Sequence, residues 1–356
     1  MSLDSPPPAG VAASEELPEE AVRLLRSTYG PSVLETDAGS AGLYALLGHV
    51  GLFERRYRNP VLVAGIASAA ERLDLARALA PGPEAPPTGY EPLGVDLVAA
   101  CVNELLVQGA LPLFFLSHVV VGESAQAAAL ELVKGIAKGC RQADCALLKN
   151  ALERGPGGWH ATGFAVGMVE RARMLDGPAA SRPGDAVLGI AASGLQGCGL
   201  GRARQVLLDA AGLKGDSEPP ELACPLAEEL LRPSRIYVRA VRALLERYRV
   251  KGVVHGVANV VRGGLAGSLA GVLGRRCVAR IEKAALPRVP ALGLIQRLGG
   301  LSDEEMFRTF NMGVGMAATV APFYADAAIR RIRRAGEKAT VIGQVAQGDG
   351  PAVELV

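Results

Sequence analysis

Cysteine and histidine, the side chains that most often bind metals or act as nucleophiles, are few and scattered in this 356-residue sequence. The six cysteines contain no CxxC pair, and none of the four histidines stands at metal-ligand spacing from another histidine or cysteine. We therefore expect no metal site built on these residues. The cysteine pattern predicts reduced thiols, most of them buried as small apolar side chains, in a cytoplasmic protein.

The stretch VLVAGIASAAERLDLA, Val61 to Ala76, reads as a buried strand that turns directly into a helix. A turn of this kind often binds phosphate, because glycines let the backbone N–H groups approach the ligand and a nearby carboxylate holds Mg²⁺. Here the turn between strand and helix consists only of alanine and serine. It predicts a junction without phosphate or metal chemistry.

The charge balance of the chain excludes several classes of partner. The 38 basic and 36 acidic residues nearly cancel, leaving a formal charge of +2, so we expect neither nucleic acid nor an anionic membrane as a partner. No apolar run reaches the roughly 18 residues that a membrane span requires. Residues 1–20 are rich in Pro, Ala and Glu and lack aromatic side chains, which predicts a disordered arm.

The elements that would position a site follow alternating strand and helix patterns. Strands are expected at 60–66, 111–121 and 162–171, with helices at 94–110 and 124–140 between them. A Pro- and Gly-rich segment, 176–185, precedes a second mixed region. The pattern predicts an α+β protein with an N-terminal domain at 39–173 and a C-terminal domain at 175–356.

The block GVDLVAACVNELLVQGALPLFFL, Gly94 to Leu116, resembles the phosphoribosylformylglycinamidine cyclo-ligase (aminoimidazole ribonucleotide synthetase) family of purine biosynthesis. The resemblance continues through TGFAVGMVER, RPSRIY and MFRTFNMGVGM in the family's order. It implies a two-domain synthetase-like fold, in which the N-terminal sheet forms a barrel across a dimer and an α/β C-terminal domain closes the cleft. It also implies an ATP- and Mg²⁺-dependent ring closure.

Two N-terminal motifs of the family are degenerate in this chain. Where the family has TDGVGTKL, this chain reads IASAAERL, so that Ala67 replaces the metal-binding Asp and Arg72 keeps the basic position. Where the family has GGETAEMP, this chain reads KNALERGP, with Lys149 in place of a glycine and Ala151 and Arg154 in place of the two glutamates. The losses predict a degenerate ATP site, because a methyl group cannot bind Mg²⁺.

Two C-terminal motifs have changed in the same way. In ASGLQGCGLGRARQ, Gln196 stands for the family's His and Cys198 for its Asn, and in ANVVRGGLAGSLAGVLG, Asn259 stands for His and Arg262 for Gly. Some polar residues of the family are retained, in sequence blocks whose apolar residues also pack the core. These retained residues are Asp96, Asn103, Ser193, Arg308, Thr309 and Asn311.

The losses favour a pseudoenzyme, a catalytically inactive relative acting as a structural, binding or regulatory partner with no cofactor. Loss of one preorganised transition-state contact costs roughly 2.7–4 kcal/mol, and several are missing together. One alternative is an active ATP-dependent cyclo-ligase using Mg²⁺ and ATP. Another is a binder of a different phosphorylated small molecule through the cations Arg72, Lys149, Arg154, Arg262 and Arg308. We expect a homodimer or a heterodimer with an active paralogue, because the strands that build the family's dimer keep their apolar character.

Overall fold

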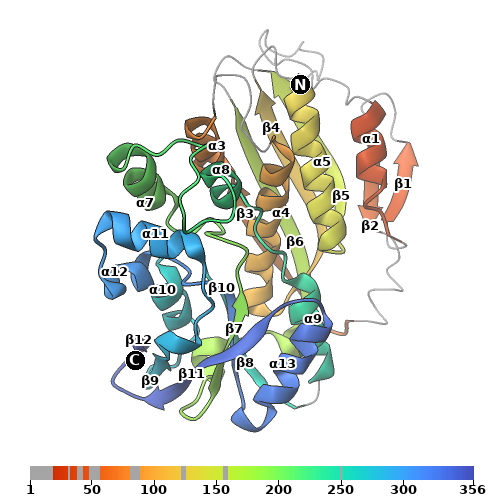
Figure 1. The fold of residues 1–356 in the computed structure, drawn as a ribbon. Coiled ribbons are helices and arrows are strands. Elements are labelled where there is room, and N and C mark those ends of the chain that lie inside the picture. The colour runs from red at the N-terminus through yellow and green to blue at the C-terminus, as the bar shows by residue number, and fades with distance from the viewer. Residues whose placement is uncertain are drawn as a thin grey trace, which may run out of the picture.

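The computed structural model of the chain describes residues 19–30, 33–37, 43–47, 57–80, 89–121, 126–154, 159–248 and 251–356. Within these residues the chain forms one four-stranded sheet, one six-stranded sheet and a small hairpin (Figure 1). The two large sheets are separate and belong to the N-terminal and C-terminal parts of the chain. Residues 1–18 of the predicted arm lie outside the described residues, and the next two, Glu19 and Glu20, begin helix α1.

In the N-terminal part, two long helices cover one face of a four-stranded sheet (Figure 1). The strand order is β3-β6-β4-β5, in which only β4 and β5 are parallel. A hairpin of β1 and β2, together with α1, lies beside β5. The elements of this part are α1 (Glu19–Arg26), β1 (Val33–Asp37), β2 (Leu43–Leu47), β3 (Pro60–Ser68), α3 (Ala70–Ala78), α4 (Glu91–Leu105), β4 (Leu111–Val121), α5 (Gln126–Gln142), β5 (Ala146–Arg154) and β6 (His160–Glu170).

Glycines allow helices α4 and α5 to pack with their backbones in contact. A Cβ atom added at Gly135 would lie 1.9 Å from the carbonyl oxygen of Glu91, and one at Gly94 would lie 2.2 Å from that of Leu132. No side chain fits at either position. The close crossing buries the apolar side chains of α4 between α5 and the sheet, which fixes the helices that carry the retained family block.

In the C-terminal part, a six-stranded sheet has the order β12-β9-β11-β7-β10-β8, and strand β10, between β7 and the edge strand β8, is buried at every residue. Only the β12–β9 pair is parallel. The elements of this part are α6 (Gly177–Ala180), β7 (Ala186–Ala191), α7 (Leu200–Arg204), the π-helix η4 (Gln205–Ala210), α8 (Leu226–Leu230), α9 (Val238–Arg247), β8 (Val254–Asn259), α10 (Gly264–Ala270), β9 (Cys277–Ile281), α11 (Pro290–Gly299), α12 (Asp303–Thr309), β10 (Val314–Val320), the short 3-10 helix η6 (Pro322–Tyr324), α13 (Ala325–Arg334), β11 (Ala339–Gln347) and β12 (Ala352–Leu355).

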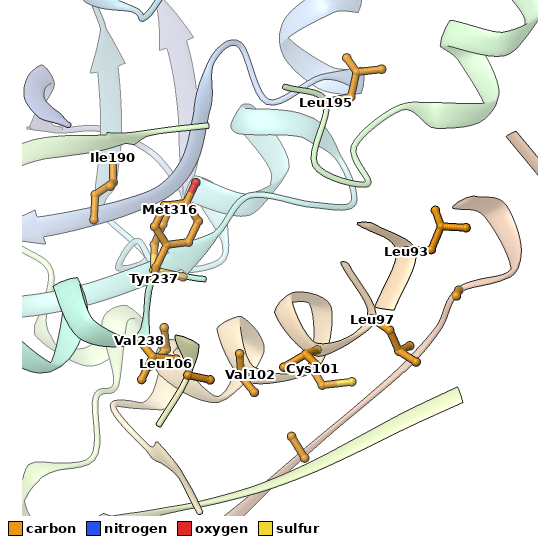
Figure 2. Packing of buried hydrophobic residues seen from close by; sticks show 14 of the residues in the cluster. Leu93, Leu97, Cys101, Val102, Leu106, Ile190, Leu195, Tyr237, Val238 and Met316 are labelled. Carbon is orange, nitrogen blue, oxygen red and sulfur yellow. The ribbon is translucent and has the colours of Figure 1, made fainter. Parts of the chain in front are cut away.

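The two parts share one buried cluster. Figure 2 shows Leu97 and Cys101 of α4, and Leu106 directly after it, together with Tyr237 and Met316 of the C-terminal part. All five belong to the same group of contacting buried side chains. A second, smaller cluster fills the space on the other side of the C-terminal sheet. The shared cluster positions the family motifs of both parts against each other.

The predicted α+β fold class is confirmed, and the structure adds strands that the periodicity does not predict. Strand β5 lies where the second motif runs, and β8 ends within the first two residues of the fourth motif. Both were missed because polar or small residues interrupt their apolar pattern. Among the described helices, none combines the length and the apolar character that crossing a membrane requires.

Candidate functional site

Two backbone N–H groups of the turn after β3 donate hydrogen bonds to acceptors of this chain. The N–H of Ala69 donates to the carbonyl of Ala161 at 2.9 Å, and the N–H of Ala70 donates to Ser68 Oγ at 3.2 Å. A phosphate-binding turn offers such N–H groups to its ligand. The Ala69 donor therefore holds the start of α3 against β6, and the Ala70 donor is used within the turn itself.

Arg72, the retained basic residue of the first motif, is buried and contacts groups of the protein. Its Nε lies 2.9 Å from Asp96 Oδ2, and its Nη2 donates to Asp96 Oδ1 at 3.0 Å. Its Nη1 donates to the carbonyl of Leu230 at 2.6 Å, and its Nη2 also donates to that of Arg232 at 3.0 Å. Only about 6% of Arg72 and of Asp96 is exposed. The guanidinium joins the N-terminal helices to the C-terminal part.

The retained block RPSRIY, residues 232–237, is held between the two parts by other retained polar residues. Asp96 Oδ1 accepts the N–H of Ser234 at 2.7 Å, and the Asn103 amide donates to the carbonyl of residue 235 and accepts the N–H of Tyr237. Ser193 Oγ donates to the carbonyl of Pro233 at 2.6 Å. Asp96, Asn103 and Ser193 thus bind backbone of this chain, a role that the sequence did not reveal.

Four residues lie in one row across the N-terminal sheet: Ala67, Gly163, Ser117 and Asn150. We call it the degenerate row. The strand register places Ala67 opposite Gly163, Gly163 opposite Ser117, and Ser117 opposite Asn150. Residues opposite each other share a face, and a Cβ at Gly163 would lie 3.1 Å from Leu97 of α4, so this row faces the helices. Ser117 Oγ donates to Asn150 Oδ1 at 2.6 Å, while the Asn150 amide nitrogen is buried without a hydrogen-bond partner among the described residues.

Three of the five cations of the phosphate-binding alternative lie apart from one another. Lys149 is exposed and lies on the face of the sheet that the helices leave open, where it pairs with Leu116 of β4. Ala151 lies on the same face, opposite His118. Arg72 is buried on the other side, and Arg308 is 72% exposed and paired with Glu304 on its own helix. Arg72, Lys149 and Arg308 therefore do not lie together in one positive pocket. Of Arg154 only the backbone is described, and Arg262 is exposed.

The third and fourth motifs meet through Cys198. Its thiol donates to the carbonyl of Val261 at 2.8 Å and lies 3.4 Å from that of Thr309. Burial raises the pKa of the Cys198 thiol from its ordinary value of 9.0 to about 12. The thiol is therefore neutral and serves as a hydrogen-bond donor within the fold, where a family enzyme has a side-chain amide.

Gln196 and Asn311 stabilise the loop that carries the third motif. Gln196 has a positive φ of 51°, is buried, and accepts a hydrogen bond from the Tyr237 hydroxyl at 2.9 Å. Burial raises the pKa of that hydroxyl. The Asn311 amide donates to the carbonyls of Gly194 and Leu195. Asn259 lies half-buried at the end of β8, opposite Met316 of β10.

The side chains present at this site do not fit a Mg²⁺–ATP complex. Magnesium prefers carboxylate oxygens, whereas the aligned row offers a methyl group at Ala67, a hydroxyl at Ser117 and an amide at Asn150. Asp96 Oδ1 already accepts hydrogen bonds from Arg72 and Ser234, and Asp96 Oδ2 lies 2.9 Å from Arg72 Nε in the buried ion pair. No group of three or more His, Cys, Asp and Glu side chains in the described part of the chain is arranged to hold a metal.

The sequence matches two family models over most of its length. These are described as AIR synthase related protein, N-terminal domain, at residues 81–169, and AIR synthase related protein, C-terminal domain, at residues 182–356. A phosphoribosylformylglycinamidine cyclo-ligase of Sorangium cellulosum is 40% identical over 353 residues, covering 97% of this chain and 96% of the relative. That of Myxococcus xanthus is 38% identical over 353 residues, covering 98% and 96%.

Solved structures with the same fold are more distant in sequence. Thiamine-monophosphate kinase from Stenotrophomonas maltophilia aligns with a TM-score of 0.64 at 19% identity, covering 94% of this chain and 95% of that one. Hydrogenase maturation protein HypE in complex with ATP aligns with a TM-score of 0.60 at 20% identity, covering 93% and 88%. These likenesses concern the fold alone. From its two matching domains and its relatives at 34–40% identity, the chain belongs to the phosphoribosylformylglycinamidine cyclo-ligase family.

Proposed function

We propose that this chain is a non-catalytic member of the cyclo-ligase family that works as a structural, binding or regulatory partner. The observation that carries the proposal is the state of Arg72. The only basic residue kept from the first motif is buried, paired with Asp96 and bonded to two carbonyls, so its donors face protein. The neighbouring turn donors are committed as well.

The second candidate function is an active ATP-dependent cyclo-ligase of purine biosynthesis. It is favoured by the names of the relatives, which are cyclo-ligases at 34–40% identity over at least 90% of this chain. In this case Mg²⁺ and ATP would bind through groups other than those of the family motifs. The two candidates therefore differ in whether Mg²⁺–ATP binds.

The open face of the N-terminal sheet supports a partner role. It carries Leu62 and Ile66, each 66% exposed, and the register places Phe164 and Leu116 beside Ile66 on the same face. Strand β3 is an edge strand of this sheet. A large exposed apolar face with an open edge is a surface that soluble proteins normally cover. We propose that a second copy, or an active paralogue, covers it.

A cytoplasmic location is part of the same proposal. All six cysteines are free, and five of them are buried. Free thiols are typical of a reducing compartment.

A titration with Mg²⁺–ATP tests the proposal against its alternative. Trp159 is the only tryptophan and stacks on Tyr90 with ring centroids 4.3 Å apart, just before β6 and the degenerate row. Its fluorescence, recorded with isothermal titration calorimetry, reports binding near this row. We expect no saturable heat or fluorescence change up to millimolar nucleotide. Saturable, Mg²⁺-dependent binding would support the active candidate.

A further inference from the structure

A cavity of about 310 Å³ lies at the junction of the two parts of the chain, and none of the four altered family motifs lines it. It is bordered by the far end of the N-terminal sheet, by the connection at 172–175, by helix α9 and by the segment leading into β8. Met168 and Glu170 end β6, whereas the degenerate row crosses β6 at Gly163, near its start. The cavity is therefore distinct from the candidate ATP site.

The inner wall of the cavity is apolar. Met168, Val169, Val253 and Val254 are each less than a tenth exposed and line it together with the half-buried Leu245. Apolar walls of this kind favour the body of a small organic molecule, because removal of its carbon surface from water is favourable.

Aromatic rings lead from the cavity to the surface. Tyr248 lines the cavity and packs edge-on against Tyr324, with ring centroids 5.6 Å apart, and Tyr324 packs edge-on against Phe323 at 5.1 Å. Phe323 is 87% exposed. A run of rings that ends in an exposed phenylalanine is an unusual surface for a protein, and it offers stacking positions to an aromatic ligand.

The charges at the cavity favour an anion. Arg173, Arg242 and Lys251 line it against Glu170 and Glu246. Glu170 already accepts the backbone N–H groups of residues 58 and 59. Arg242 is already paired with Asp144, which also pairs with Arg239. The ammonium nitrogen of Lys251 lies 3.3 Å from the Tyr324 hydroxyl.

Arg173 is the cation best placed to bind a ligand. Its side chain is exposed and has no ion-pair or hydrogen-bond partner among the residues that the structure describes. An arginine can bind the two oxygens of a carboxylate, phosphate or sulfonate at once.

We propose that this cavity binds a small amphipathic anion, whose aromatic or aliphatic body lies on the apolar wall while its single anionic group pairs with Arg173. Because the cavity touches both parts of the chain and the connection between them, the bound anion would stabilise their relative arrangement. This site does not depend on whether the chain is catalytic.

Two fluorescent probes that differ only by an anionic group test the proposal on the full chain. These are 8-anilinonaphthalene-1-sulfonate and its uncharged parent N-phenyl-1-naphthylamine. We expect the sulfonate to bind at one site per chain, at least tenfold tighter than the uncharged probe. The Arg173→Gln variant should weaken the sulfonate at least fivefold and leave the uncharged probe unchanged. The control variant Arg275→Gln, which removes another exposed arginine outside the cavity, should leave both affinities unchanged.

Two further variants separate the cavity from the open sheet face. Leu245→Trp fills the cavity and should abolish binding of both probes, with circular dichroism and the thermal midpoint confirming that the variant is folded. Ile66→Ser alters the open sheet face and should leave binding unchanged. Wild-type sulfonate affinity in Arg173→Gln, or loss of binding in Ile66→Ser but not in folded Leu245→Trp, would overturn the proposal.

Discussion

Arg72 and Asp96 form a buried ion pair in which Nε and Oδ2 are 2.9 Å apart, and the same guanidinium binds the carbonyls of Leu230 and Arg232. The pair thus spans the junction between the N-terminal and C-terminal parts. A residue at a position where the family binds nucleotide contributes here to the structure. This relationship leads to a first prediction about stability.

Replacing Arg72 with methionine should destabilise the protein by about 3–5 kcal/mol, because Asp96 would remain buried without its partner. The urea midpoint in equilibrium unfolding measures the change. Arg77→Met on the same helix is the matched control, since Arg77 pairs with Asp74 at the exposed surface and should cost less than about 1 kcal/mol. Equal effects of the two substitutions would contradict a structural role of Arg72.

Replacing Gly135 with alanine should disrupt the α4–α5 packing. The new Cβ would meet the carbonyl oxygen of Glu91 at 1.9 Å, and backbone cannot move aside as a side chain can. We expect a loss of about 1–3 kcal/mol or more. Gly293→Ala in helix α11 meets nothing within 4 Å and should stabilise by up to about 1 kcal/mol. Thermal unfolding of both variants checks the difference in sign.

The protein should lose stability as pH rises from 9 to 12. Burial raises the pKa of the Cys101 and Cys198 thiols from 9.0 to about 12. In this interval the unfolded chain releases protons that the folded chain retains, so the free energy of unfolding falls by up to about 1.4 kcal/mol per pH unit for each thiol. Below pH 9 this contribution is fully present. Urea unfolding at pH 8, 9.5 and 10.5 measures the slope, and Cys198→Ala should reduce it. An unchanged slope in that variant would count against the assignment.

Replacing Ile66 with aspartate should convert a dimer into monomers, because a charge would be introduced on the open face of the N-terminal sheet. Sedimentation velocity at micromolar concentration measures the mass. Leu298→Asp is the matched control, since Leu298 is an exposed leucine on helix α11, and it should leave the mass unchanged. A wild-type chain that is a monomer, and that also fails to bind an active cyclo-ligase subunit, would refute the proposed interface.

Much of the fold could be predicted because its long elements have strong periodicity. Strands β3, β4 and β6 and helices α4 and α5 follow from the apolar pattern alone. Strand β5 does not, because the polar residues Lys149 and Asn150 interrupt it and its parallel neighbour β4 is reached only through α5.

At the candidate site the sequence predicts lost family residues, but it does not predict the contacts that the present residues make in the structure. The carbonyl that Arg72 binds belongs to Leu230, which is 158 residues away along the chain. Likewise, the face on which Lys149 lies depends on a register irregularity between Phe115 and Leu116. Such contacts depend on tertiary packing, which local patterns do not encode.

Turnover is the measurement that tests the proposed non-catalytic function most directly. The purified chain would be incubated with formylglycinamidine ribonucleotide, ATP and Mg²⁺, and both aminoimidazole ribonucleotide and ADP would be measured. The relative from Sorangium cellulosum in the same assay is the positive control. The account predicts that this chain forms neither product above the rate without protein, whereas sustained formation of the two products in equal amounts would contradict it.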